Sequence, residues 1–193
     1  MEQPDFFFAA SALPAGMVYR RDFLAPAEEL ELLDAIHALP FQEAQYREWN
    51  ARRRIVSYGG RYDFSRNELL VAEPIPGFLH PLRQRIAAWA GEAAGKFTHA
   101  LINEYSPGTP LGWHRDAPVF DTVVGVSLAG DGRMRLRRYP PRKGRDQATV
   151  LDMAPRSAYI LSGEARWDWQ HAISPARSLR YSVTFRTLRN RPG

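Results

Sequence analysis

Hydrophobic residues recur at intervals of three and four in two segments of the first half of the chain, which is the spacing of one face of an α-helix. The first segment runs from Pro26 to Leu39 and the second from about Gly77 to Ala94. Their apolar stripes consist of Leu30, Leu33 and Ile36, and of Leu79, Leu82, Ile86, Trp89 and Ala93. Proline suits a first helical turn, and Gly95 is a typical stop for the second segment. The pattern predicts two helices before residue 96.

After Gly95 the apolar residues occur in short runs rich in Val, Ile, Tyr, Trp and Thr, separated by Pro and Gly turns. Such runs are typical of β-strands. They predict strands near residues 98–105, 113–116, 123–128, 134–139, 148–152, 158–161, 167–171 and 179–188. Eight strands favour a double-sheet jelly roll, and the two preceding helices would cover one of its sheets. We therefore expect an α+β fold, a double-stranded β-helix (jelly roll) with N-terminal helices packed on one sheet.

The length of 193 residues fits one domain with a self-sufficient core, and no repeat or linker divides the chain. We expect a single domain over residues 1–193, with the helices and a covering segment in residues 1–95 and the jelly-roll core in residues 96–188. The absence of cysteine excludes a disulfide framework, a thiolate zinc site and a cysteine nucleophile. No signal-peptide pattern or membrane-length apolar run is present. We expect a cytoplasmic monomer with no membrane partner.

The chain is basic, with a formal net charge of +5 and a sequence pI of about 9.8. Nearly all of the positive charge is on arginine, because Lys96 and Lys143 are the only lysines. A basic surface favours a polyanionic partner through counterion release, although a compositional bias toward arginine explains the same values equally well. In residues 133–138 the arginines alternate with Met134 and Leu136, which an ordinary solvated strand face explains. The same row of arginines could form a phosphate track.

His114 and Asp116 have the spacing of a metal-ligating pair. Side chains two residues apart on an extended segment point to the same face, so both can contact one ion. A His-x-Asp pair with a distant histidine matches the two-histidine, one-carboxylate arrangement that holds non-haem Fe(II) and leaves positions open for a co-substrate and oxygen. His171 is the candidate for the third ligand, since no other histidine follows residue 114. His37, His80 and His99 have no ligand spacing and are predicted to be surface or capping residues.

The segment from Arg180 to Arg186 carries an unusual polar face. At a period of two, Arg180, Ser182, Thr184 and Arg186 point one way, while Tyr181, Val183 and Phe185 point the other. A guanidinium inside a barrel is costly to desolvate unless an anion meets it, and its fork suits a carboxylate. Beside an iron triad, buried arginines indicate a small dicarboxylate.

Together these motifs resemble the AlkB family of Fe(II)/2-oxoglutarate dioxygenases. The family pattern runs Asn-x-Tyr, a Pro-Gly turn, His-x-Asp, a distant His and Arg-x-Asn-x-Thr-x-Arg. It is matched by Asn103, Tyr105, Pro107, Gly108, His114, Asp116, His171, Arg180 and Arg186, over roughly residues 50–188. The resemblance implies Fe(II), 2-oxoglutarate and O2 as cofactor and co-substrates. It also implies that Arg180 and Tyr105 hold the distal carboxylate of 2-oxoglutarate, and that Arg186 and Asn103 support its iron-side carboxylate.

Departures from the family pattern concern the substrate. Ser182 stands where the repair enzymes usually have Asn, so one contact to the co-substrate is expected to be shorter or water-mediated. After Asp116 the chain reads APVFDT, a compact apolar connection in place of the longer acidic stretch that reads the damaged base in the bacterial repair enzyme. The short gap from His171 to Arg180 is more like family members that act on transfer RNA or on targets other than nucleic acid.

By the same resemblance, a hairpin near Arg61, Tyr62 and Phe64 would cover or hold the substrate. Arg52, Arg53 and Arg54 precede this hairpin, and a solvated basic segment before a strand explains them without any role in substrate binding. We expect oxidative demethylation of N-alkylated bases in DNA or RNA, as in alkylation repair. The alternatives are the same chemistry on modified transfer RNA, a methylated protein or a small molecule. A different class of function, a non-catalytic nucleic-acid-binding jelly roll, would not need all three ligands together with both arginines.

Overall fold

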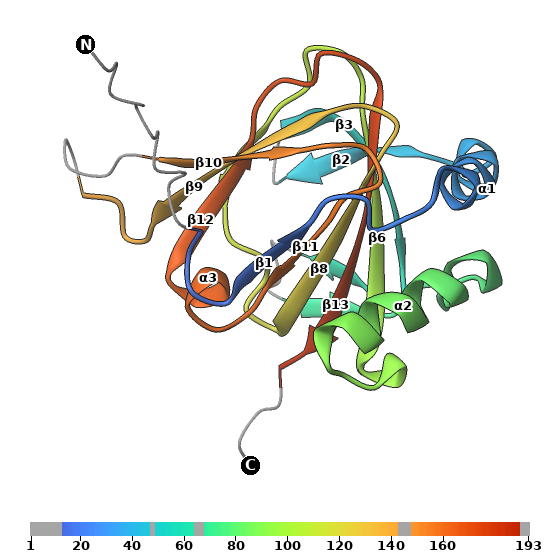
Figure 1. Cartoon of the computed structure of the whole chain (residues 1–193), viewed down its shortest axis with the longest axis horizontal. Coiled ribbons are helices and arrows are strands. Elements are labelled where there is room, and N and C mark those ends of the chain that lie inside the picture. The colour runs from blue at the N-terminus through green and yellow to red at the C-terminus, as the bar shows by residue number, and fades with distance from the viewer. Residues whose placement is uncertain (1–12, 47–48, 64–67, 143–147, 190–193) are drawn as a thin grey trace, which may run out of the picture.

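The computed structural model describes residues 13–46, 49–63, 68–142 and 148–189, which form two facing antiparallel sheets (Figure 1). The seven-stranded sheet contains, in spatial order, β1 (Met17–Arg20), β11 (Ala158–Leu161), β8 (Phe120–Leu128), β13 (Arg180–Leu188), β6 (Phe97–Tyr105), β3 (Trp49–Tyr58) and β2 (Gln42–Tyr46). The four-stranded sheet contains β10 (Thr149–Met153), β9 (Gly132–Arg138), β12 (Trp169–Ile173) and β7 (Leu111–His114). This double sheet is the predicted jelly roll.

The space between the sheets is filled by alternate residues of their strands. In β9, Met134 and Leu136 are buried, while Arg133 and Arg135 are exposed on the other face, as the alternation predicted. These two apolar side chains join one core cluster with Leu161 of β11. Because the period of side chains on a strand is two, one face of each strand fills the core.

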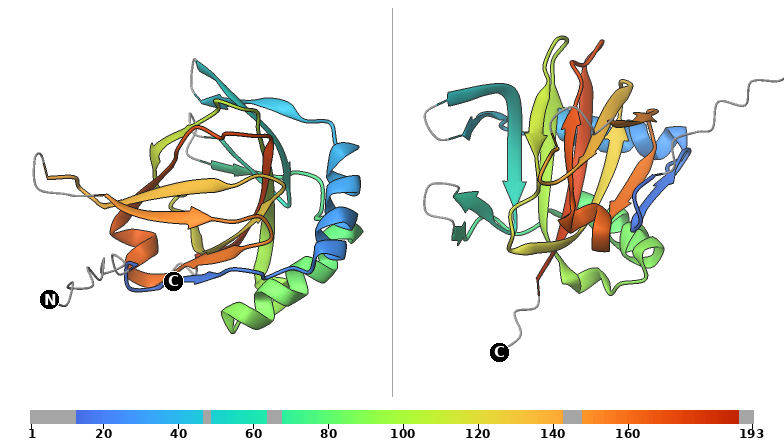
Figure 2. Two further views of the ribbon diagram at one scale, coloured as in Figure 1. Left: turned by 45° about the horizontal axis from the view of Figure 1, so that its top comes forward. Right: turned by 90° about the vertical axis from the view of Figure 1, so that its left-hand side faces the viewer.

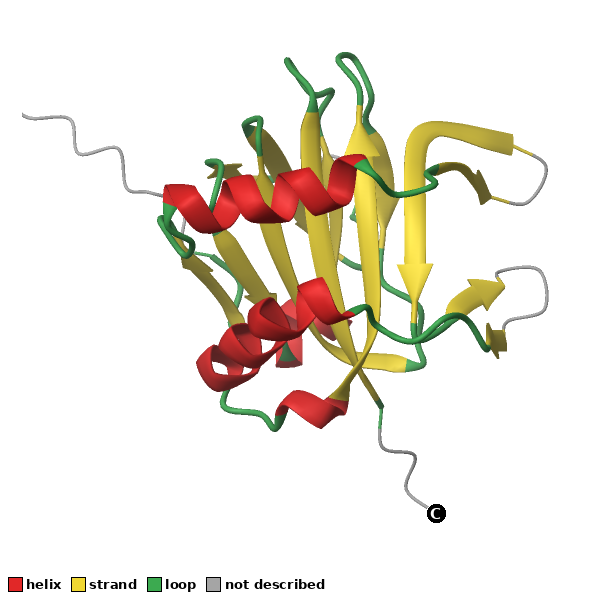
Figure 3. Ribbon diagram, turned by 90° about the vertical axis from the view of Figure 1, so that its right-hand side faces the viewer, coloured by secondary structure: helices red, strands yellow, loops and turns green. Residues whose placement is uncertain are grey.

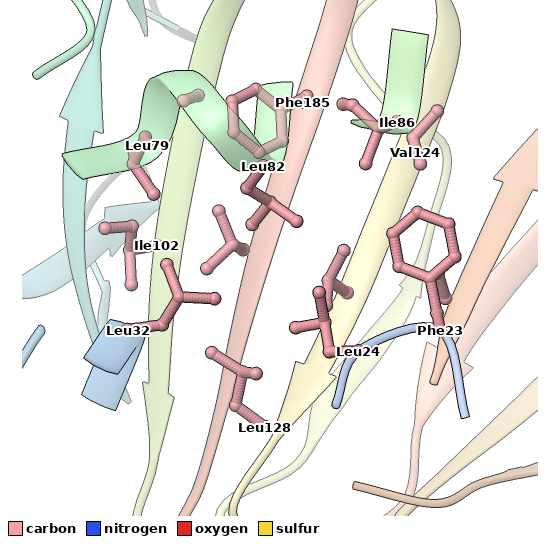
Figure 4. Close-up of a cluster of buried hydrophobic side chains, with 14 of the residues drawn as sticks. Phe23, Leu24, Leu32, Leu79, Leu82, Ile86, Ile102, Val124, Leu128 and Phe185 are labelled. Carbon is pink, nitrogen blue, oxygen red and sulfur yellow. The ribbon is translucent and has the colours of Figure 1, made fainter. Parts of the chain in front are cut away.

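Helices α1 (Pro26–His37) and α2 (His80–Ala90) cross the outer face of the seven-stranded sheet (Figure 3). Side chains of both helices, among them Leu32 and Ile36 of α1, meet strand residues such as Ile102 and Phe185 in the second core cluster (Figure 4). Burying a side chain of this size is worth about 1.5–3 kcal/mol. The predicted cover of one sheet by N-terminal helices is confirmed.

The predicted apolar stripes were partly wrong. Leu30 is 63% exposed, because Leu32 and Ile36 form the buried face of α1 and Leu30 lies on the opposite side, and Ala93 lies beyond the end of α2 and is exposed.

Both helices are shorter than predicted. The first ends at His37, with Ala38 as its C-cap, and begins where the Glu28 carboxylate accepts a hydrogen bond from the Ala25 N–H at 2.8 Å. The segment predicted as one second helix divides into a 3-10 turn, η1 (Gly77–Leu79), and α2, which is stopped by Gly91 rather than Gly95. Gly91 has a φ of 69°, a left-handed conformation that glycine adopts without strain. A further 3-10 turn, η2 (Ala94–Lys96), leads into β6.

The strand predictions need three corrections. Trp167, predicted to begin a strand, ends the short helix α3 (Gly163–Trp167), and β12 starts two residues later. Asp116 lies beyond the end of β7 instead of inside the strand. Residues 52–54 lie within β3, not before a strand. Strands β1 and β2 and the first half of β3 were not predicted.

Strands β4 (Arg61–Asp63) and β5 (Glu68–Leu70) form a separate hairpin beside the end of β3 (Figure 2). The turn into this hairpin requires Gly59, which has a φ of 74° and whose added Cβ would lie 1.8 Å from the Thr98 carbonyl oxygen. Along the described parts of the chain, no helix has the length and apolarity needed to cross a membrane.

Candidate active site

A pocket with about 410 Å³ of empty space, including its mouth, lies between the two sheets. It is lined by Arg53, Leu101, Asn103, Tyr105, Leu111, His114, Asp116, Val123, Tyr159, His171, Ile173, Arg180, Ser182, Thr184 and Arg186. All of the residues predicted to hold the metal and the co-substrate are among them. Segments far apart in sequence supply these side chains because β6 and β13 are neighbours in one sheet and β7 and β12 are neighbours in the other.

The two histidines form a cross-strand pair. His171 of β12 lies opposite His114 of β7, and their ring centroids are 4.2 Å apart. Burial is the main cause that lowers the pKa of both imidazoles, that of His171 to about 3. Each ring is therefore neutral near pH 7 and retains a lone pair. His114 Nδ1 lies 2.9 Å from the Gly112 carbonyl oxygen, so an Nδ1–H donor leaves Nε2 free to bind a metal.

Asp116 is buried beside this pair. Its Oδ1 accepts a hydrogen bond from Arg186 Nε at 2.7 Å, and its Oδ2 lies 3.8 Å from His171 Nε2. Burial alone would raise the pKa of this carboxyl group, but the positive charge of Arg186, the largest opposing effect, holds it below its usual range. Asp116 is therefore ionised.

These donors fit a metal ion chemically, although they are not yet closed around one point. Among the described residues, no three His, Cys, Asp or Glu side chains are already arranged as a metal site. The Asp116 carboxylate is turned to Arg186 instead. Two neutral imidazoles and one carboxylate nevertheless form the donor set that suits non-haem Fe(II).

The same pocket is lined by Arg180, a buried cation that has no counter-ion among the described residues. Arg180 is 2% exposed, and its guanidinium donates from Nε to Ser127 Oγ at 3.0 Å and lies 5.0 Å from the Tyr105 ring centroid. Its Nη1 is buried and has no hydrogen-bond partner. In the described parts of the chain no carboxylate forms an ion pair with it. A buried charged donor is stable only with an acceptor, so this part of the pocket is suited to an anion.

Asn103 carries a second unsatisfied atom in the same pocket. Its Nδ2 donates to Ser182 Oγ at 3.3 Å, and its Oδ1 is buried without a partner. Amide orientation is inferred from hydrogen bonding, and the flipped amide would accept from the Ser182 hydroxyl and present Nδ2 to the pocket. A carboxylate in the pocket would then find donors from both Asn103 and Arg180.

The model of the 2OG-Fe(II) oxygenase superfamily matches residues 16–186 of this sequence. The chain belongs to this superfamily. Within the superfamily it is AlkB-like, as its motifs predicted. It is 30% identical to the "Alkylated DNA repair protein ALKBH8 homolog" of Arabidopsis thaliana, over 92% of this chain and 59% of that protein.

Two further comparisons extend this result. The chain is 26% identical to the Xenopus tropicalis protein named "tRNA (carboxymethyluridine(34)-5-O)-methyltransferase alkbh8", over 94% of this chain and 33% of that protein. It therefore spans only part of the length of either relative. The solved structure of OsALKBH1 superposes with a TM-score of 0.71 at 17% identity, covering 91% of this chain and all of that one. This likeness confirms the predicted fold.

His99 is a component of this AlkB-like site that the sequence interpretation placed wrongly at the surface. It is buried, and its Nδ1 and Nε2 lie 3.2 Å from Arg186 Nη1 and from Ser57 Oγ. Burial, followed by the charge of Arg186, lowers the pKa of His99 to about 3, so the neutral ring can accept from Arg186. The signal was available, because His99 has the same strand parity as Asn103 and Tyr105.

Arg166 was also missed. It lies on α3, is 2% exposed, and donates from Nη2 to the carbonyl oxygens of Ala117 and Phe120, each at 2.8 Å. A third, longer contact reaches the Asp116 carbonyl oxygen at 3.3 Å. These bonds hold the apolar connection that follows Asp116 and so fix the carboxylate's position. No sequence spacing indicates this contact, since fifty residues separate its partners.

The predicted substrate-covering residues are less well connected to the pocket. Arg61 and Tyr62 lie on β4, where Tyr62 does not line the pocket, and Phe64 lies outside the described residues. The pocket does contain Arg53, whose Nε is buried without a hydrogen-bond partner. Its neighbour Arg54 points away and binds the Glu104 carboxylate with both Nε and Nη2, at 2.6 and 2.8 Å. Of these two arginines, only Arg53 can contact a ligand in the pocket.

Proposed function

We propose that this chain is an Fe(II)- and 2-oxoglutarate-dependent dioxygenase that oxidises an N-alkyl group on a nucleic-acid base, with iron held by His114, Asp116 and His171. The observation that carries the proposal is the convergence of both halves of the motif on one pocket, the metal donors beside the unpaired Arg180. A non-catalytic binding domain would have no use for a buried, unpaired cation that lines the same pocket as a metal-ligand set.

Iron with bound 2-oxoglutarate and O2 would supply the oxidation of a C–H bond, while 2-oxoglutarate is decarboxylated to succinate and CO2. The protein's own residues hold and orient these groups. Neutral His114 and His171 offer lone pairs, and Arg186 keeps Asp116 ionised through a short hydrogen bond. A hydroxylated N-methyl group would then leave as formaldehyde.

The co-substrate would lie along β13. Arg180, with Tyr105 under its guanidinium, would bind the distal carboxylate through its free Nη1. Asn103 would donate to the iron-side carboxylate from a flipped amide that is held by Ser182. Arg186 already contacts Asp116 and His99, so its main role would be to hold the carboxylate of Asp116, the proposed iron ligand.

The substrate class rests on the AlkB-like sequence and on the basic surface. Arg53 of the pocket would contact the substrate. Arg61, Tyr62 and Phe64 would contact it too, as the resemblance to the AlkB family implies. Modified transfer RNA is the second candidate, favoured by the short gap from His171 to Arg180 and by the name of the Xenopus tropicalis relative. We assign the reaction to the cytoplasm, because a cysteine-free chain that uses Fe(II) suits a reducing compartment.

The test begins without a prime substrate. The protein is incubated with Fe(II), 2-oxoglutarate and ascorbate, and iron-dependent succinate formation is measured. Slow uncoupled turnover is expected. N-methylated DNA, N-methylated RNA and modified transfer RNA are then compared by mass spectrometry for loss of the alkyl group or gain of oxygen. Nucleic-acid binding without any succinate would identify a non-catalytic jelly roll and overturn the proposal.

Gly132→Ala should raise the KM for 2-oxoglutarate by about three- to tenfold. Complete removal of the charge-assisted hydrogen bond from Arg180 would cost about 1.5–3 kcal/mol, and a displaced guanidinium should lose part of it. The added Cβ would lie 2.6 Å from Arg180 Nε and 3.0 Å from its Cζ, so the guanidinium has to move. Gly95→Ala is the matched control, because its Cβ would enter open space. Equal KM values in the two variants would contradict the role given to Arg180.

A further inference from the structure

The outer face of the four-stranded sheet lies directly behind the metal-ligand set. His114 and His171 point into the pocket, so their chain neighbours Trp113, Arg115 and Gln170 point to the other side. Gln170 is opposite Arg137 of β9, and Arg135 follows on the same face. Helices α1 and α2 pack on the other sheet, so that neither of them covers this face (Figure 2).

Three arginines of this face lack the carboxylate partners that five other arginines have in the described parts of the chain. Arg54, Arg85, Arg133, Arg138 and Arg156 each form an ion pair with a carboxylate. Within the described residues, no carboxylate pairs with Arg115, Arg135 or Arg137. Their charge is therefore available to an external anion.

Aromatic rings and polar groups hold these guanidiniums in place. Arg135 and Arg137 both lie over the Trp113 ring, with Cζ 5.1 and 4.2 Å from its centroid. Arg137 also donates from Nε to Gln170 Oε1 at 3.0 Å, and Arg115 lies 3.8 Å above the Tyr139 ring. A stacked guanidinium keeps its in-plane N–H groups exposed, and its preset geometry reduces the entropy lost when a phosphate binds.

The position of β7 connects this face to the pocket. It is an edge strand of its sheet and supplies His114 to the pocket. Arg115 stands between the pocket-lining residues His114 and Asp116, yet is itself exposed. A chain that leaves the pocket across this edge meets Arg115 first and then Arg137 and Arg135.

We propose that the outer face of the four-stranded sheet binds the sugar-phosphate backbone of a single-stranded nucleic acid whose target base enters the pocket. Arg115, Arg135 and Arg137 contact successive phosphates, and Trp113 fixes two of the guanidiniums. The inference rests on the proposed function, since it assumes a nucleic-acid substrate. Within the charged row of residues 133–138, it assigns Arg135 and Arg137 to phosphate binding, in preference to a merely solvated face.

The test measures binding of a fluorescein-labelled oligouridylate over a series of salt concentrations. Arg135→Gln combined with Arg137→Gln should reduce the slope of log K against log salt by about 1.4, because each phosphate of a single strand that an arginine neutralises adds about 0.7 to the slope. Between 50 and 200 mM salt, the affinity of the wild-type protein would then fall about sevenfold further than that of the double variant. Arg115 is left intact because its neighbours are candidate iron ligands.

Arg20→Gln combined with Arg21→Gln is the control, since it removes the same charge from exposed positions at the end of β1. Its slope should equal that of the wild type, and thermal unfolding checks the fold of every variant. An unchanged slope in the Arg135 and Arg137 variant, or an equal decrease in the control, overturns the proposed phosphate-binding surface. Neither result affects the proposed dioxygenase activity. Preferential binding to phosphatidylserine vesicles over the oligonucleotide also overturns the phosphate-binding surface. If the wild-type protein fails to bind RNA at every salt concentration, the proposal of a nucleic-acid substrate is refuted. Succinate formation tests the dioxygenase activity separately.

Discussion

Asp116→Ala should abolish iron-dependent succinate formation and also destabilise the metal-free protein by about 3–5 kcal/mol. The loss of turnover follows from the removal of one of the three proposed iron ligands. The loss of stability follows from Arg186, whose side chain is 11% exposed and would remain buried without its carboxylate partner. Removing one member of a buried ion pair leaves an uncompensated charge, and this cost exceeds that of the missing packing.

His114→Ala separates the two effects. The His114 ring bonds only to the Gly112 carbonyl oxygen among the described residues and carries no charge, so its removal should abolish turnover with little loss of stability. Asp116→Asn should also lose turnover but retain more stability than Asp116→Ala, because its amide oxygen can still accept from Arg186 Nε. Succinate assays and urea denaturation of the metal-free variants provide both measurements. Full turnover with any of the three substitutions would refute the ligand assignment, and wild-type stability of Asp116→Ala would refute the role of the ion pair.

The sequence predicted the parts of this molecule whose physical rule is local. Alternation in β13 separates Tyr181, Val183 and Phe185 from a polar face, and the structure buries the first set in the core while the second lines the pocket. Such a strand is recognisable because one face must be apolar and the other unusually polar for a buried position. The His-x-Asp spacing is similarly local, although Asp116 lies in the irregular segment after β7 and not in a strand.

The missed elements depend on distant partners. Strands β2 and β3 are rich in Gln, Glu, Ala and Arg, residues that do not favour strands by themselves. Pairing with β6 and the Arg54–Glu104 ion pair give β3 its place in the sheet. The strand parity of His99 indicated which face it occupies, but its partners Arg186 and Ser57 come from neighbouring strands. Spacing along the chain carries no record of these contacts.

Arg180→Met should raise the KM for 2-oxoglutarate by about tenfold to a hundredfold while leaving the ligand-free protein as stable as the wild type or more stable. The first effect is the removal of a charge-assisted hydrogen bond worth about 1.5–3 kcal/mol. The second follows because Arg180 is 2% exposed and its Nη1 has no partner, so the ligand-free protein bears the cost of a desolvated cation. Replacing a buried charge by an apolar side chain of similar volume is often neutral or stabilising.

Arg180→Lys and Arg180→Ala complete this test. Lysine keeps the charge but cannot offer two parallel donors, so it should restore only part of the affinity for 2-oxoglutarate. Alanine should lose affinity as methionine does, but it should also lose stability, because it leaves a cavity against Tyr105 and Gly132. Thermal unfolding with and without 2-oxoglutarate gives an independent measure, since the co-substrate should raise the Tm of the wild type much more than that of Arg180→Met. If methionine lowers stability as much as alanine does, Arg180 supports the fold. If methionine loses only the affinity for 2-oxoglutarate, the buried cation is retained for the ligand.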